Sequence, residues 1–132
     1  AALALGRLGY LLGESRYIQA AEHTLIAGWA SMLEFPHGHA ALITALDEHL
    51  SEREIIIVRG EGDEPAEWCA TIRQLFTPER LSFAVPTGDT SLPQALALKK
   101  PGDTTIAYVC RGNTCSEPVT ELQELAGMIT DS

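Results

Sequence analysis

The sequence has little cysteine, few basic residues and no long apolar run. Its three cysteines among 132 residues are too few, and odd in number, for a disulfide-stabilised secreted scaffold. The composition is otherwise ordinary, 45% hydrophobic and 20% charged, which excludes a disordered tail and a collagen-like repeat. The length fits about one globular domain, and the cysteine usage predicts a reducing, cytoplasmic location.

Basic residues are scarce relative to acidic ones. Nine Lys and Arg face eighteen Asp and Glu, so the net charge is −9 at neutral pH. Residues 1–50 carry −3 (two basic, five acidic) and residues 51–132 carry −6 (seven basic, thirteen acidic). A negative field repels phosphodiester backbones, and no basic stripe counters it. We therefore expect no nucleic-acid partner.

The apolar runs are short. Thr24–Leu33 falls far below the roughly 20 residues that a membrane span needs, and no basic segment precedes the opening apolar run to form a signal peptide. We therefore expect no membrane partner. The chain starts at Ala1, without methionine and already inside an apolar helical pattern, which favours a piece of a longer polypeptide.

Residues 1–50 show the apolar period of helices. Residues 2–12 are rich in Leu and Ala, which favour helix, and a break of four residues predicts an antiparallel pairing with the next helix. That helix is expected to end near Pro36, because proline disfavours helical geometry in the preceding residue, and a third helix follows. The expected apolar stripes are Ile18, Ala21, Leu25, Trp29 and Met32 on the second helix, and Leu42, Ile43, Leu46, His49 and Leu50 on the third.

Residues 51–132 alternate strands with helices. Runs of β-branched and aromatic residues predict three strands, at residues 55–58, 81–85 and 105–110. Helices are expected after each strand, from Pro65, Ser91 and Thr120. The alternation predicts an α/β fold, in which a helical segment over 1–50 precedes a small three-stranded parallel sheet with flanking helices over 51–132.

Three loops would share one edge of such a sheet, where parallel sheets bind their ligands. The candidate crevice residues in these loops are Gly60, Gly62, Asp63, Asp89, Arg111 and Asn113. Two glycines between a strand and a helix are typical of a phosphate cradle, but the third glycine is missing and three acidic residues follow Gly60. A tight turn is therefore favoured over a nucleotide site, and we expect no cofactor.

Cys110 and Cys115 flank four residues of turn-forming sequence, and such a turn can bring two sulfur atoms within disulfide range. A structural role is favoured, because Cys110 continues an apolar strand. Thiol–disulfide exchange stays open, because Arg111 and a nearby helix N-terminus favour a thiolate, although the usual redox spacing is Cys-x-x-Cys. Metal binding is disfavoured, because no second paired ligand motif is present. Cys69, beside Trp68, is expected in the core.

Histidines and carboxylates form no catalytic pattern. His37 and His39 flank a glycine at a turn, with no neighbouring set of ligands, so a capped turn is favoured over a metal clip. The sequence contains no nucleophile-elbow, zinc-protease or calcium-loop motif. We assign no catalytic and no metal-binding residue, and we expect the chain by itself not to be an enzyme.

Two passages together resemble one protein family. Residues 11–22, from Leu11 to Glu22, look like a late helical hairpin of an (α/α)6 barrel. Residues 107–120, which contain the Cys-x4-Cys spacing, look like the closing motif of one large family. The members of this family are thioredoxin-domain-containing proteins related to a spermatogenesis-associated protein of animals. The resemblance implies a thioredoxin-like domain, then a six-hairpin barrel similar to N-acylglucosamine 2-epimerases and glycosidases, then a tail. This chain would be the last fifth or so, and the family supplies an architecture rather than a reaction.

The resemblance and the residues lead to three hypotheses. The favoured one is a non-catalytic module that completes the barrel and packs, through an exposed apolar face of its first helices, against upstream domains of the same polypeptide or as a homodimer. The second is thiol–disulfide exchange by Cys110 and Cys115 with the absent thioredoxin-like domain. The third places carbohydrate chemistry in the parent barrel, with this segment only closing its wall.

Overall fold

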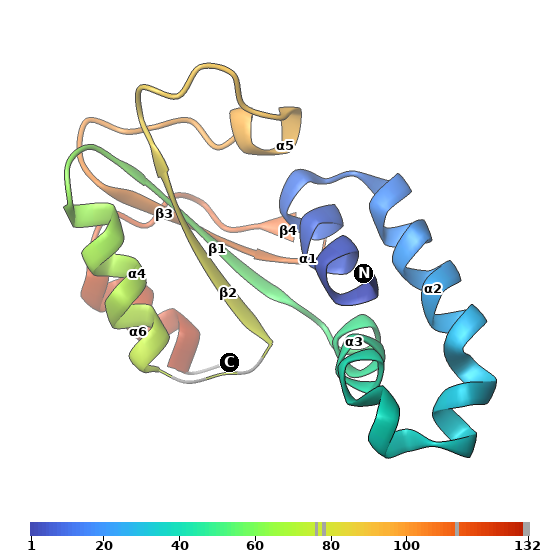
Figure 1. The fold of residues 1–132 in the computed structure, drawn as a ribbon. Coiled ribbons are helices and arrows are strands. Elements are labelled where there is room, and N and C mark those ends of the chain that lie inside the picture. The colour runs from blue at the N-terminus through green and yellow to red at the C-terminus, as the bar shows by residue number, and fades with distance from the viewer. Residues whose placement is uncertain (76, 78, 113, 131–132) are drawn as a thin grey trace. The chain divides into compact units, whose positions relative to one another are not determined.

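The computed structural model describes residues 1–75, 77, 79–112 and 114–130 (Figure 1). Within them the chain divides into two compact units, residues 1–52 and residues 53–132. This boundary lies two residues after the one expected from the change in apolar period. No helix in the described part of the chain is long and apolar enough to cross a membrane.

The first unit is helical. It contains α1 (Ala2–Leu12), α2 (Ser15–Glu34), a short 3-10 helix η1 (Pro36–His39) and α3 (Ala40–Leu50), which are the three helices that the apolar period predicted. Gly13 ends α1 in the left-handed conformation, with φ of 67°, where a side chain would be strained. The backbone N–H groups of Gly13 and Glu14 both donate to the carbonyl of Gly9, which closes the helix.

The core of the helical unit is small. Ala2, Leu25 and Ala45 are buried together, one from each helix, and Leu3, Leu42 and Leu46 pack around them. α2 and α3 approach closely at Gly28, where an added Cβ atom would clash with the Leu42 Cδ2 atom. An ion pair between Arg7 and Glu48, 2.6 Å long, joins α1 to α3.

The second unit is an α/β fold, as the alternation predicted. Its strands are β1 (Glu54–Gly60), β2 (Arg80–Pro86), β3 (Ile106–Arg111) and β4 (Thr114–Cys115), and its helices are α4 (Glu64–Gln74), α5 (Gln94–Ala97) and α6 (Leu122–Thr130). The strand order is β2-β1-β3-β4. β1 lies between β2 and β3, and every one of its residues is buried, as its continuous apolar run predicted.

The prediction that all strands are parallel is wrong for β3. β1 and β2 are parallel, but β3 pairs with β1 antiparallel, and β4 adds an antiparallel edge that the sequence pattern did not predict. The physical reason is the connection from β2 to β3. Its only helix, α5, has four residues, and the connection returns to the end of the sheet at which β2 finished, so no crossover to a parallel strand takes place.

α4 and α6 cover the same face of the sheet (Figure 1). Trp68, Cys69 and Ile72 of α4 and Leu125 and Ile129 of α6 are buried against inward-facing residues of the strands. Those strand residues are Ile56 and Val58 of β1 and Ala107 and Val109 of β3. The expected core position of Cys69 is therefore confirmed, and Trp68 lies beside it in the same core.

The Lys99–Lys100 segment lies over the opposite face of the sheet. Arg59 of β1 is buried there, and its guanidinium donates to the carbonyls of Lys99, at 3.0 Å, and Pro86, at 3.3 Å. The Tyr108 hydroxyl of β3 donates to the Lys100 carbonyl at 2.8 Å. Because side chains alternate along a strand, Cys110 shares this face with Tyr108.

Candidate functional site

The structure does not bring the six predicted crevice residues together. Gly60 ends β1, Gly62 and Asp63 lie between β1 and α4, and Asp89 follows β2, so these four lie near one end of the sheet. Arg111 lies at the other end, opposite Glu54, because β3 runs antiparallel to β1. Asn113 lies outside the described residues.

A polar pocket of about 380 Å³ lies at the first of these ends. Its lining consists of Gly60, Glu61, Glu64, Thr87, Gly102, Asp103, Thr104 and Thr105. The Thr105 hydroxyl donates to the Glu64 carboxylate, which fixes the start of α4 against the start of β3. The lining contains three carboxylates and no basic side chain, so it opposes a phosphate rather than cradling one.

The glycines of this loop are explained by backbone geometry. At Gly60 a Cβ atom would lie 2.6 Å from the Thr105 Oγ1 atom and 2.9 Å from the Pro65 Cγ atom. Gly62 has φ of 68°, a conformation that L side chains rarely adopt. The loop therefore needs glycine for a tight turn and a close approach, which is the interpretation that the sequence favoured.

Metal ligands do not gather in the structure. Over the described ranges, no group of three or more His, Cys, Asp and Glu side chains is placed to hold a metal ion. His37 and His39 belong to η1 at the end of α2, and the Nδ1 atom of His39 lies 2.9 Å from the Phe35 carbonyl. This contact fits the capped turn that the sequence favoured.

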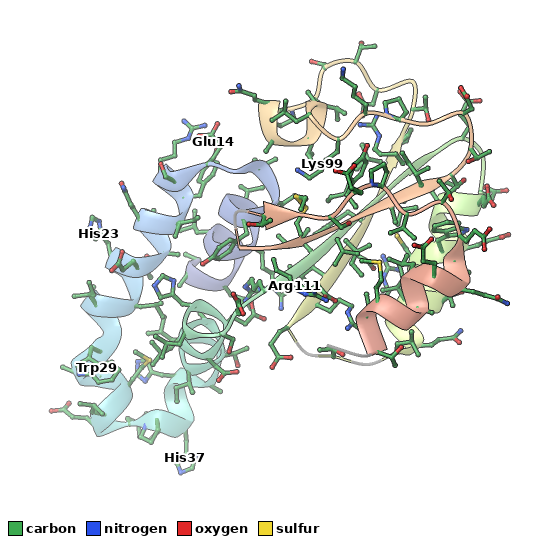
Figure 2. All side chains as sticks on the ribbon, turned by 180° about the vertical axis from the view of Figure 1, so that it is seen from behind. Glu14, His23, Trp29, His37, Lys99 and Arg111 are labelled. Carbon is green, nitrogen blue, oxygen red and sulfur yellow. A yellow bond between two sulfur atoms is a disulfide. The ribbon has the colours of Figure 1, made fainter. Side chains whose placement is uncertain are left out.

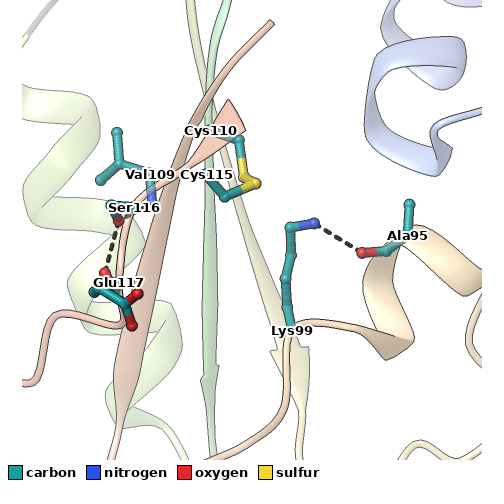
Figure 3. Close-up of a disulfide and its surroundings, with 7 residues drawn as sticks. All are labelled: Ala95, Lys99, Val109, Cys110, Cys115, Ser116 and Glu117. Atoms are coloured by element: carbon teal, nitrogen blue, oxygen red, sulfur yellow. Dashed lines mark hydrogen bonds between the residues drawn. A yellow bond between two sulfur atoms is a disulfide. The ribbon is translucent and has the colours of Figure 1, made fainter. Parts of the chain in front are cut away.

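Cys110 and Cys115 form a disulfide across the β3–β4 hairpin (Figure 3). Gly112 turns the hairpin with φ of 56°, and the two cysteines lie directly opposite each other, with Cα atoms 3.9 Å apart. The neighbouring pair is hydrogen-bonded, since the Ser116 N–H donates to the Val109 carbonyl at 2.8 Å. The cysteines therefore occupy a non-hydrogen-bonded pair, in which side chains lie closest. The prediction that the turn brings the sulfurs within bonding range is confirmed.

A buried ion cluster lies at the hairpin end of the sheet. The Glu54 carboxylate of β1 accepts the Arg80 Nε–H of β2 at 2.5 Å on one oxygen and the Arg111 Nε–H of β3 at 2.8 Å on the other. Arg80 donates further to the carbonyls of Leu75, at 3.1 Å, and Ile129, at 2.6 Å. The cluster joins three adjacent strands, and it accounts for Arg111 as a structural side chain.

The helical unit carries an apolar groove of about 420 Å³ between α2 and α3. Its lining consists of Glu22, Leu25, Ile26, Trp29, Leu46, His49 and Leu50. Trp29 is 50% exposed and Ile26 is 65% exposed. Among the described residues, eight large hydrophobic side chains are exposed, and seven of them belong to this unit. The apolar face expected on the first helices is therefore present.

Trp29 lies at the exposed edge of the expected stripe of α2. Ala21, Leu25 and Met32 of that stripe are buried, whereas Trp29 is half exposed and also forms a second stripe with Ile26 and Leu33. That stripe has the i, i+3, i+7 spacing of a helix-packing face. The two stripes are adjacent on the helix, so together they form one wide apolar face. Such a face is wider than one neighbouring helix covers.

No family model, no curated protein and no solved structure matches the chain. The geometry defines an α/β protein with a separate helical unit, a hairpin disulfide and an apolar groove on the helical unit.

Proposed function

We propose that the chain is a non-catalytic packing module, whose helical unit completes a larger α-helical assembly. The occupant of the groove is a helix from a preceding barrel of the same polypeptide, as the family resemblance implies. The observation that supports this proposal is the exposed stripe of Ile26, Trp29 and Leu33, because Ile26 and Trp29 of this stripe line the groove. Contiguous exposed apolar surface of this kind marks an interaction site.

The shape and chemistry of the groove fit a helix. It runs between two helices, and its lining consists of leucine, isoleucine and tryptophan side chains together with Glu22 and His49. A partner helix would place apolar residues at i, i+3, i+4 and i+7 into it. Trp29 is the residue type most often found at the energetic centre of protein interfaces.

The charge of the chain argues against a second copy as the occupant. Each chain carries −9, and residues 1–50 alone carry five acidic and two basic side chains. Two copies meeting at this face would repel each other, whereas a helix flanked by Lys or Arg would complement Glu22 in the groove lining.

Cysteine labelling at one helix position, with a control on the same helix, tests the occupant. Trp29→Cys reports the groove, and Ser31→Cys reports the opposite side of α2, because two residues turn a helix by about 200°. Ser31 is exposed. Maleimide labelling is measured by mass spectrometry on the peptide that contains each substitution, in this chain and in a polypeptide that also carries the preceding barrel helices.

We expect both positions to label rapidly in this chain. In the longer polypeptide the rate at position 29 is expected to fall at least tenfold, while the rate at position 31 stays the same. Equal rates at position 29 in the two proteins would overturn the proposal. Protection of position 29 that grows with the concentration of this chain alone would also overturn it, in favour of a second copy.

A further inference from the structure

The two sulfur atoms of the hairpin disulfide differ in accessibility. Cys110 is 8% exposed, on a sheet face, whereas Cys115 is exposed at the edge strand. An attacking thiolate therefore reaches Cys115 first. We propose that this pair is a thiol–disulfide exchange site that takes two electrons from an accessible dithiol, with Cys115 as the attacked sulfur and Cys110 as the leaving sulfur.

The hairpin is held together without the sulfur atoms. The Ser116 N–H donates to the Val109 carbonyl and the Val109 N–H donates to the Ser116 hydroxyl at 3.1 Å. Ala107 and Val119 then exchange two backbone hydrogen bonds, of 2.9 and 2.8 Å. The disulfide closes a sequence separation of only five residues, and such short loops gain least from a crosslink. Reduction therefore leaves the hairpin paired, as a reversible exchange requires.

A lysine lies on the side of the sheet to which the sulfurs project. The backbone carbonyls of Lys99 and Lys100 accept hydrogen bonds from Arg59 and Tyr108, which places this segment over the face that carries Cys110. Figures 2 and 3 both show the Lys99 side chain close to the hairpin on that face. Its ammonium donates to the Ala95 carbonyl at 2.7 Å, and no carboxylate partner is found for it among the described residues.

Lys99 has no carboxylate partner among the described residues, whereas Arg111, the other nearby cation, has one. Arg111 is ion-paired with Glu54, and because side chains alternate along β3 it leaves the strand on the opposite face from Cys110. Partial burial lowers the pKa of Lys99, because the ammonium has lost hydration. A thiolate formed on Cys110 provides the Lys99 ammonium with a negatively charged partner. The ammonium in turn stabilises the thiolate.

The exchange step balances in two stages. A thiolate of the dithiol attacks the Cys115 Sγ atom, a mixed disulfide forms, the Cys115–Cys110 bond breaks, and its electron pair leaves as the Cys110 thiolate. The mixed disulfide joins Cys115 to the first sulfur of the dithiol. The second thiolate of the dithiol attacks that first sulfur, and the Cys115 thiolate is released. The dithiol loses two electrons and two protons, and the cysteine pair gains them as two thiols.

Two single-cysteine variants test the order of attack. Cys110→Ser leaves Cys115 as a free thiol and Cys115→Ser leaves Cys110, and each is reacted with an aromatic disulfide that releases a coloured thiol. Cys69 is buried on the other face, so it contributes little in the folded protein. We expect Cys115 to react at least ten times faster than Cys110, with circular dichroism confirming that both variants are folded. Equal rates, or a faster Cys110, overturn the assignment.

The intact hairpin provides the second test, which does not depend on how well those variants fold. The protein is reduced with dithiothreitol as the dithiol. The protein thiols that appear are counted, and the circular dichroism signal of the folded protein is recorded at the same time. We expect two thiols to appear with no loss of native signal, and a rate of reduction three- to tenfold lower in Lys99→Gln but unchanged in Lys100→Gln, whose side chain is exposed. Reduction that occurs only with unfolding, or equal rates in the two variants, overturns the proposal.

Discussion

Glu54 holds the hairpin end of the sheet by accepting from two arginines on the flanking strands. The carboxylate is almost fully buried, and so is the Arg80 side chain that it faces. A buried charge that loses its partner is strongly unfavourable, because neither water nor another ion replaces the lost interaction. The strand register therefore depends on this one carboxylate.

Glu54→Gln is expected to lower the free energy of unfolding by about 3 kcal/mol, because it strands the buried Arg80 guanidinium. Glu52→Gln, an exposed carboxylate two residues earlier, is the control, and its effect should stay within about 0.5 kcal/mol. Urea denaturation followed by circular dichroism measures both. A Glu54→Gln loss no larger than that of the control would contradict the role given to the cluster.

Gly60 is required by close packing rather than by a ligand. Gly60→Ala is expected to lower the free energy of unfolding by about 1–3 kcal/mol, because the new Cβ atom would clash with Thr105 and Pro65. Gly88→Ala is the matched control, because a Cβ atom there meets nothing within 4 Å. The same urea titration compares them, and equal stabilities would show that the loop can move aside.

At the scale of elements, the exposed stripe on α2 should bind an apolar dye. Replacing Ile26 and Leu33 by glutamine is expected to reduce the fluorescence of a bound hydrophobic dye by at least half, because both side chains lie on the exposed stripe. Leu98→Gln removes an equally exposed leucine of the other unit and should change little. If the chain binds no dye, or if the two variants behave alike, the stripe is not the apolar surface described.

The helices and three of the strands could be predicted from the sequence, because local periodicity and proline positions determine them. The direction of β3 could not, since it depends on the path of the connection that contains α5. β4 has only two residues and no period to detect. The pairing of Cys110 with Cys115 could be predicted, because a single turn brings the two residues together. The predicted crevice placed Gly60 near Arg111, which requires β3 to run parallel to β1.

At the scale of the whole molecule, the two units differ in how well they cover their own apolar residues. The core cluster of the α/β unit contains ten buried residues, which lie between two helices and a sheet, whereas the core cluster of the helical unit contains three. Of the eight large apolar side chains that are exposed among the described residues, seven belong to the helical unit. A domain with so small a core has little stability of its own. The helical unit is therefore the part of the chain that gains most from a partner.

The most direct measurement of the packing role is photo-crosslinking from position 29. A photoreactive amino acid replaces Trp29, or Ser31 as the control, in a polypeptide in which barrel helices precede residue 1, and mass spectrometry identifies the crosslinked peptide. We expect a crosslink from position 29 to an apolar helix of the same polypeptide, and none to that helix from position 31. A crosslink from position 29 to a second copy of this chain, or the absence of any crosslink, would contradict it.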